Sequence, residues 1–207
     1  MLQAFINEFI ILFVAIDPVG TVPLLAALTR SMDESSRRKL VTRGVSIAAI
    51  VLFAFAIFGQ VLLTALGVSF ASFRIAGGIL LFLVGVQMVF QAHAEDGNHT
   101  AGEFSGRDLA IFPIALPYIA GPGAILAVMV VMRGAPDWGN FSLKCVTLAV
   151  VMAATLWILL FTSKLHKILG RTGGEVIARV MGILLAALAA ESVVRGILEV
   201  LGRAPVL

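Results

Sequence analysis

The sequence predicts an all-α integral membrane protein with six transmembrane helices, arranged as two inverted three-helix repeats whose first and fourth helices are broken. Composition is the first observation behind this: 60% of the 207 residues are hydrophobic and 13% are charged, whereas a soluble domain carries about 25% charged residues. The mean hydropathy is +1.05. The second is a series of apolar runs of about 18 residues or more, which are long enough to cross a bilayer. The third is a pair of matched proline interruptions.

Six spans can be drawn along the chain. They are 4–29, 43–66, 71–91, 108–132, 142–163 and 177–200. We expect helices throughout, because lipid offers the backbone no outside hydrogen-bond partner. The first span has no Lys or Arg before it and no convincing small-residue cleavage site, so we expect it to be retained. The most polar stretch, 93–106, is predicted to link a first repeat (1–92) to a second (107–207).

Each repeat begins with a span that two prolines interrupt. Pro18 and Pro23 lie in the first span and Pro117 and Pro122 in the fourth, an offset of 99 residues for both pairs. A proline lacks an amide hydrogen and crowds the carbonyl four residues back, so an unbroken helix does not accommodate two of them. Paired broken segments in the two halves of a membrane protein indicate the binding site of a transporter.

A second, weaker repetition supports the inverted arrangement. Arg74-x-x-Gly77 opens the third span, and Arg179-x-x-Gly182 opens the sixth, an offset of 105 residues. Because each half contains an odd number of spans, the second half must enter the membrane upside down. Gly77, Gly78, Gly85 and Gly182 are expected to let helices approach closely.

Asp17 is the leading candidate for chemistry. An ionised carboxylate inside a span costs roughly 2.5–3.5 kcal/mol, so it should face protein or a water-filled cavity, where it could bind a substrate amino group, Na⁺ or a proton. The alternative is a capping role, with Asp17 as N-cap and Pro18 at the first helical position. The two roles are compatible, and both stay open.

Backbone amides at the breaks form a second set of candidates. New half-helices are expected after Pro23 and Pro122, with free amides at 24–26 and 123–125 that would bind a carboxylate or phosphate. The alternative is a proline kink with small residues for helix packing. The candidate substrate-binding residues are Asp17, Pro18, Gly20, Thr21, Pro23, Leu24, Pro117, Gly121, Pro122, Gly123 and Ala124.

Three charged residues are candidates for coupling or gating, namely Arg74, Arg179 and Glu191. Arg74 and Arg179 open spans on opposite faces of the membrane, and each is alternatively a snorkelling anchor. Glu191, Arg195 and Glu199 follow one another at intervals of four residues on one stripe of the sixth span, so an internal ion pair is the alternative to a coupling role.

The Lys and Arg distribution predicts the orientation. Segments 30–43 and 164–179 hold most of the basic residues and are expected on the cytoplasmic side, which places both termini outside the cytoplasm. Ser31 and Glu34 resemble a capping box at the start of a helix in the first of these segments. We read the net charge of +3 as orientation information and expect no nucleic-acid partner.

We expect no metal, no cofactor and no enzymatic activity. His93 and His99 lie in the polar link at a spacing that fits no standard ligand pattern, and a lone Cys145 fits no cysteine-based site. The sequence contains no nucleophile elbow, phosphate-binding loop or zinc-protease motif.

Four motifs, in order, resemble the MarC family, also called the neutral amino acid transporter (NAAT) family. They are Asp17-Pro18-x-Gly20-x-x-Pro23, Phe73-Arg74-Ile75-Ala76-Gly77-Gly78-Ile79-Leu80, Pro113-x-x-x-Pro117-x-x-x-Gly121-Pro122-Gly123-Ala124, and Leu169-Gly170 leading to Arg179-Val180-Met181-Gly182. The resemblance implies six spans, membership of the broader LysE-like exporter superfamily, and transport of small neutral amino acids such as glycine or alanine across a bacterial or archaeal inner membrane. The chain departs from the family pattern at Thr21, where Asn is more common, and at Glu191, where Gln is more common.

The sequence therefore predicts an alternating-access carrier with its substrate at the midplane between the two broken spans. The alternatives are an exporter of another small metabolite or a cation on the same scaffold, and a membrane scaffold that transports nothing. The expected partners are a small neutral amino acid and the lipid bilayer, with H⁺ or Na⁺ as the candidate coupling ion and a homo-oligomer as the candidate assembly.

Overall fold

The computed structural model describes residues 2–29, 32–90, 115, 118–133 and 137–202, and every regular element within these ranges is a helix. The helices are α1 (Leu2–Ile16), α2 (Thr21–Leu28), α3 (Glu34–Ala65), α4 (Phe70–Phe90), α6 (Pro122–Arg133), α7 (Trp138–Leu160) and α8 (Thr162–Val200). The predicted linker 93–106 lies outside the described residues.

Four of the described segments are long and apolar enough to cross a membrane. They are α3, α4, α7 and the part of α8 from Val176 to Val200, which confirms the predicted second, third, fifth and sixth spans. Their boundaries differ from the prediction at two points, because α3 already begins at Glu34 and α8 at Thr162. The first predicted span is divided between α1 and α2.

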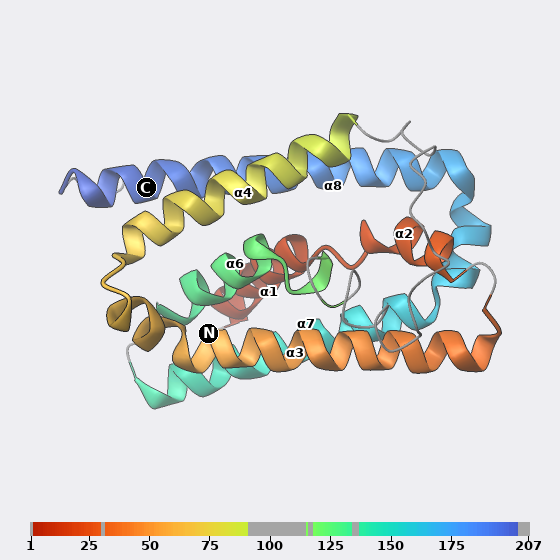
Figure 1. Cartoon of the computed structure of the whole chain (residues 1–207), viewed down its shortest axis with the longest axis horizontal. Helices are drawn as coiled ribbons and strands as arrows, with labels where there is room; N and C mark the ends of the chain where they lie inside the picture. The colour runs from red at the N-terminus through yellow and green to blue at the C-terminus, as the bar shows by residue number, and fades with distance from the viewer. Residues whose placement is uncertain (1, 30–31, 91–114, 116–117, 134–136, 203–207) are drawn as a thin grey trace.

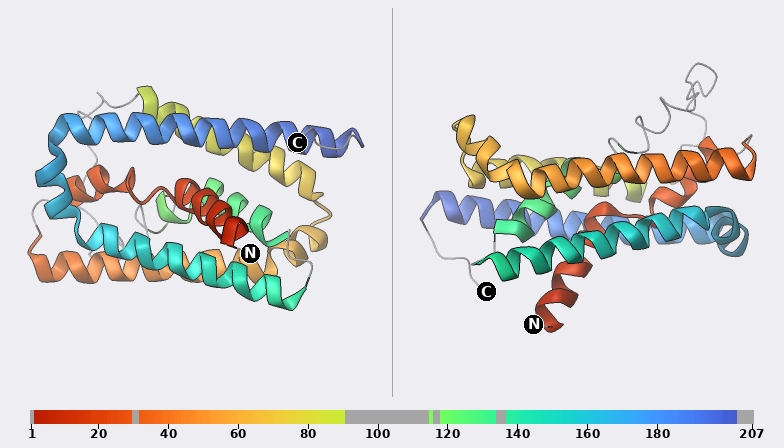
Figure 2. Two further views of the ribbon diagram at one scale, coloured as in Figure 1. Left: turned by 180° about the vertical axis from the view of Figure 1, so that it is seen from behind. Right: turned by 90° about the horizontal axis from the view of Figure 1, so that it is seen from below.

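The helices form three layers (Figure 1). Helices α4 and α8 make up one outer layer and run antiparallel, and α3 and α7 make up the other. The short helices α1, α2 and α6 lie between them, and α1 and α6 contact each other as well as both outer layers. The view from behind shows the same arrangement (Figure 2). The short helices thus occupy the centre, and the long ones enclose them.

Glycines bring α4 and α8 into close contact. A β-carbon on Gly85 would lie 2.7 Å from the carbonyl oxygen of Gly182, and one on Gly182 would lie 2.8 Å from the carbonyl oxygen of Gly85. Seven residues before Gly85, a β-carbon on Gly78 would lie 3.1 Å from the carbonyl oxygen of Ala189. Small residues allow two helix backbones to approach in this way, so the packing role expected for these glycines is confirmed.

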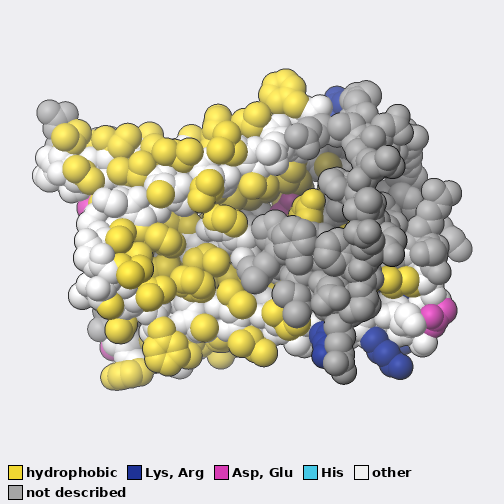
Figure 3. Space-filling model, in the orientation of Figure 1, with side chains coloured by type: hydrophobic (Ala, Val, Ile, Leu, Met, Phe, Trp, Pro, Cys, Tyr) yellow, Lys and Arg dark blue, Asp and Glu magenta, His cyan; other side chains and the backbone are white. Residues whose placement is uncertain are grey.

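The outer surface is apolar, as expected of a protein that faces lipid. Large hydrophobic side chains such as Phe58 (63% exposed) and Trp157 (65%) point away from the core, and hydrophobic side chains cover most of the described surface in Figure 3. The core itself lies between the layers and contains fully buried Leu12, Ile16 and Val128. Exposed apolar area this extensive marks a membrane interface.

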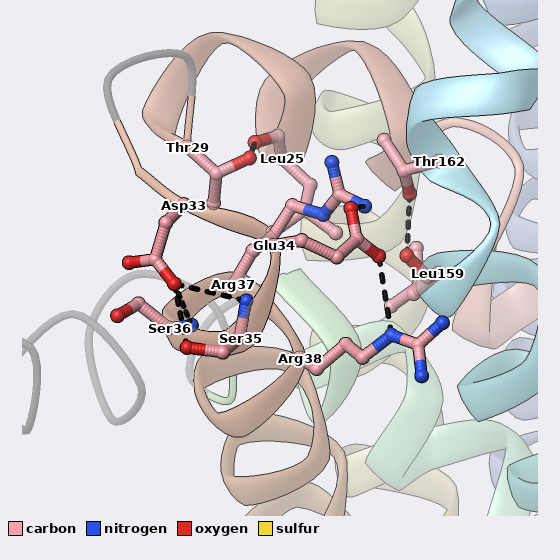
Figure 4. A network of polar contacts seen from close by, with 10 residues as sticks. All are labelled: Leu25, Thr29, Asp33, Glu34, Ser35, Ser36, Arg37, Arg38, Leu159 and Thr162. Carbon is pink, nitrogen blue, oxygen red and sulfur yellow. Dashed lines mark hydrogen bonds and ion pairs between the residues drawn. The ribbon is translucent and has the colours of Figure 1, made fainter.

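Helix α3 begins at a different cap from the one predicted. Asp33 is the N-cap, and its carboxylate accepts hydrogen bonds from the amides of Ser35 (3.0 Å) and Ser36 (3.1 Å) (Figure 4). Glu34 is then the first helical residue and pairs with Arg38 one turn later. The predicted capping box of Ser31 and Glu34 is therefore wrong. It requires Glu34 in the third helical position, whereas Glu34 is the first residue of α3.

Candidate functional site

The first broken helix is interrupted at Asp17, as predicted. Asp17 has φ +47°, a left-handed conformation that Asp tolerates better than most residues. Its amide still donates to the carbonyl oxygen of Phe13 (3.0 Å), which makes it the residue that ends α1. Pro18 follows and has no amide hydrogen to continue the helix.

The Asp17 carboxylate is buried, and it accepts a hydrogen bond from the turn that precedes α2. The side chain is 9% exposed, and its Oδ1 accepts a hydrogen bond from the amide of Gly20 (3.0 Å). The Asp17 carbonyl oxygen accepts two further bonds from Thr21, one from the amide (3.2 Å) and one from the hydroxyl (2.9 Å). The predicted capping role, with Asp17 as N-cap and Pro18 at the first helical position, is wrong, because α2 begins only at Thr21 and Asp17 has a positive φ. A buried carboxylate at a helix break suits the ligand role.

Helix α2 begins at Thr21, and not after Pro23 as the sequence analysis expected. The amides of Thr21 and Val22 are bonded to the carbonyl oxygens of Asp17 and Val19. Pro23 therefore lies in the first turn of α2, where no amide hydrogen is needed. The side chains of Pro23 and Leu24 lie outside the described residues.

The second break precedes α6. The amide of Ala120 donates to the carbonyl oxygen of Ala115 (2.9 Å), a wide π-type turn of the kind found at functional sites. After Gly121, α6 begins at Pro122, where a missing amide hydrogen costs nothing. Pro117 lies outside the described residues.

The free amides of α6 are fewer than expected. The amide of Ile125 donates to the carbonyl oxygen of Gly121 (3.0 Å), so it is not available to a ligand. Gly123 and Ala124, both buried, occupy the first-turn positions whose amides have no acceptor within their own helix. An anion could bind at these two positions.

Both breaks lie in the middle layer. Ile16 and Val22, which flank the first break, belong to the same buried cluster as Ala120 and Ala124, which flank the second. Helices α1 and α6 are in direct contact. Residues that flank the two breaks, from both halves of the chain, are therefore part of one buried core.

A third element, α4, reaches both breaks. A β-carbon on Gly20 would lie 2.0 Å from Asp17 Oδ2 and 2.6 Å from the Met88 methyl carbon. A β-carbon on Gly123 would lie 2.1 Å from Leu81 Cδ1. Neither glycine can carry a side chain without displacing a neighbour. Leu81 and Met88 were not among the predicted site residues, since nothing in the local sequence shows which face of α4 meets the breaks.

Two of the three predicted gating residues, Arg74 and Glu191, lie in ion pairs. Arg74 is 4.0 Å from Glu199, which also accepts a hydrogen bond from Arg133 at the end of α6 (2.7 Å). Glu191 pairs with Arg195 one turn along α8, so the internal ion pair considered for this stripe is confirmed for these two residues. Arg179 is half-buried in the opposite half of α8.

A buried ion pair at the same end of α6 was not predicted. Lys144 Nζ of α7 lies 2.6 Å from Glu8 Oε1 of α1 and 2.9 Å from the carbonyl oxygen of Val131. Lys144 is 8% exposed, and ionisable residues placed this way inside spans usually have a partner. The one available signal was the presence of a Glu and a Lys in two predicted spans.

Comparison with known proteins identifies the family. The model of the MarC family of integral membrane proteins matches residues 2–201. A UPF0056 membrane protein of Methanocaldococcus jannaschii is 35% identical over 199 residues, which cover 95% of this chain and 97% of that protein. A UPF0056 membrane protein of Archaeoglobus fulgidus is 35% identical over 200 residues (96% and 94%). The UPF0056 inner membrane protein YhgN of Escherichia coli is 28% identical over 192 residues (93% and 95%).

No solved structure matches the chain. The family match covers nearly all of the sequence, including both breaks and the three helices that follow each of them in the layers described above. The chain therefore belongs to the MarC family of integral membrane proteins.

Proposed function

We propose that the protein is a secondary transporter of small neutral amino acids, such as glycine or alanine, that works by alternating access. The observation that carries this proposal is the contact between two interrupted helices in the middle of a helical membrane protein. Interrupted helices supply uncovered backbone groups and cavities that a continuous helix lacks. The substrate would lie between the two breaks.

The layer arrangement supports an inverted repeat of six transmembrane segments. Each half contributes an interrupted helix to the middle layer, one helix to the α3 and α7 layer, and one to the α4 and α8 layer. Helices α4 and α8, the last of each half, run antiparallel. Two halves of opposite orientation would give this arrangement.

Each charged end of an amino acid has a matching group at the breaks. The ammonium group would bind the Asp17 carboxylate, and the carboxylate would bind the amides of Gly123 and Ala124 at the positive end of α6. Gly20 and Gly121 would leave the backbone accessible nearby. Pro18, Thr21, Pro23, Leu24, Pro117 and Pro122 would shape the two turns.

Access would be controlled at the ends of the layers. Arg74 and Glu199, with Arg133, link α4, α6 and α8 on one side, and Arg179 stands toward the other end of α8. These contacts, together with the Glu191 pair, would form and break as the outer layers move. We further propose an inner-membrane location, by analogy with the Escherichia coli relative, with both termini outside the cytoplasm and H⁺ or Na⁺ as coupling ion.

The test is counterflow of radiolabelled alanine and glycine in proteoliposomes, with other small metabolites and cations in the same panel. Asp17→Asn removes the charge but keeps an oxygen for the Gly20 amide and a residue that tolerates positive φ. We expect a loss of transport of at least tenfold in a folded protein. Asp137→Asn, at the exposed cap of α7, is the matched control. Unchanged transport by Asp17→Asn would leave Asp17 with a structural role only, as the acceptor for the Gly20 amide.

A further inference from the structure

Helix α4 places two apolar side chains against the two breaks. Leu81 and Met88 are seven residues apart, which is two helical turns, so they lie on one face. Leu81 fills the position that a side chain on Gly123 would occupy, and the Met88 methyl group fills the corresponding position at Gly20. One helix thus closes both interruptions from the same side.

The position of α4 is held by the helix behind it. The backbones at Gly85 and Gly182 are in contact, and Val193 of α8 lies against Gly78. Helix α4 therefore cannot move closer to α8 to widen the space at the breaks. The lengths of the Leu81 and Met88 side chains therefore set how closely α4 approaches the two breaks.

These two side chains belong to an apolar cluster. Leu81 is 5% exposed and packs with Val14 of α1 and Leu185 of α8, and Met88 packs against the same group. The Met88 methyl group and the Asp17 carboxylate both crowd the same point above Gly20. A carboxylate and an apolar methyl group are therefore adjacent at the first break.

We propose that Leu81 and Met88 set the upper size limit of the substrate side chain. This inference rests on the proposed function. An amino acid whose ammonium group binds Asp17 must direct its side chain toward neighbouring groups, and the α4 side of this space is already occupied. A hydrogen or a methyl group would then fit beside Met88 and Leu81, and a branched side chain would not. Met88 is unbranched and flexible, so it is the residue that determines how strict the limit is.

The test compares leucine and alanine counterflow by wild type and variants in proteoliposomes. One missing methylene in an apolar pocket changes selectivity by about 10- to 200-fold. Met88→Ala, and separately Leu81→Ala, should therefore raise the ratio of leucine to alanine transport at least tenfold. Leu83→Ala is the control, because Leu83 is on the same helix but 52% exposed on the outer surface. It should leave the ratio unchanged.

A second measurement guards against variants that fail to fold. Met88→Cys is introduced in a Cys145→Ser background, since Cys145 is the one native cysteine. Bound alanine should slow alkylation of the introduced thiol at least tenfold, and it should not protect the thiol in Leu83→Cys. An unchanged transport ratio or an unprotected thiol, in a chain whose wild type transports alanine, would overturn the size limit alone. A wild type that transports no amino acid would overturn the proposed function and this inference with it.

Discussion

The Lys144 ammonium group lies 2.6 Å from the Glu8 carboxylate, joining two spans that are 136 residues apart in the sequence. Lys144 also donates to the carbonyl oxygen of Val131 (2.9 Å), near the end of α6. Uncapped carbonyls at a helix C-terminus attract a cation. The pair therefore connects α1, α6 and α7. It lies at the C-terminal end of α6, where Arg133 donates a hydrogen bond to Glu199.

Loss of this buried pair should destabilise the protein. Lys144→Met leaves the partly buried Glu8 carboxylate without its partner; the loss should be smaller than the roughly 3–5 kcal/mol of a fully buried pair. We expect a clearly lower thermal unfolding midpoint in detergent micelles. The matched control is Lys39→Met, because Lys39 is exposed on α3. The charge-swapped double variant Glu8→Lys with Lys144→Glu should recover part of the loss, since a glutamate cannot donate to Val131.

The cluster of Glu199 with Arg74 and Arg133 should contribute less to the free energy of unfolding than the Lys144–Glu8 pair. The reason is that its side chains are partly exposed. Glu199→Gln leaves Arg74 and Arg133 without their shared carboxylate. Exposed ion pairs contribute up to about 1 kcal/mol, so the unfolding midpoint should fall modestly. Glu191→Gln, which removes a local pair along α8, should change it less. Equal effects of the two variants would show that the cluster adds nothing beyond a local pair.

Asp17→Ala should destabilise the protein more than Asp17→Asn. Alanine loses the hydrogen bond to the Gly20 amide, and it adopts the left-handed conformation at a cost of roughly 1–2 kcal/mol. Asparagine avoids both penalties. Unfolding midpoints of the two purified variants measure the difference, and transport measurements on Asp17→Asn then report the effect of the charge.

Substitutions at the contact between α4 and α8 should be poorly tolerated. Gly85→Leu forces a side chain into the backbone of Gly182, and overpacking of this kind costs roughly 1–3 kcal/mol or more. We expect little folded protein after membrane extraction. Ala76→Leu adds a similar side chain to the exposed face of α4 and should be harmless. Normal yields of Gly85→Leu would contradict the close approach of the two helices.

The cap of α3 predicts a pH effect. Hydrogen bonds from the hydroxyl groups of Ser35 and Ser36, together with their amides, lower the pKa of Asp33 below its ordinary value of 3.8. A lowered folded-state pKa means that the stabilisation is present above pH 3.8 and is lost as the pH falls below it. Asp33→Asn keeps the cap without titrating. The difference in unfolding midpoint between wild type and Asp33→Asn should therefore shrink as the pH approaches about 3.

Much of the architecture could be predicted because it follows from local chemistry. Apolar length identifies the long helices. Proline identifies the interruptions, since Pro18 and Pro122 cannot donate the hydrogen bond that a continuing helix needs. The small residues Gly78, Gly85 and Gly182 indicated close helix packing before their partners were known. These properties depend on one residue and its immediate neighbours.

What the sequence did not reveal depends on contacts between distant segments. The Lys144 and Glu8 pair, and the approach of Leu81 and Met88 to the breaks, require the relative placement of four helices. The start of α2 at Thr21 was missed for a different reason. The left-handed turn at Asp17 lets the next helix begin before Pro23, and no pattern of apolar residues reports a single backbone angle.

The close contact between α4 and α8 joins the last helix of one half of the chain to the last helix of the other. Any motion that separated the two halves would have to pull apart backbones that touch at Gly85 and Gly182. In the proposed transport mechanism the moving units would therefore not be the two halves of the sequence. They would be layers, each assembled from both halves, which slide or tilt over the short middle helices while every tightly packed helix keeps its neighbour.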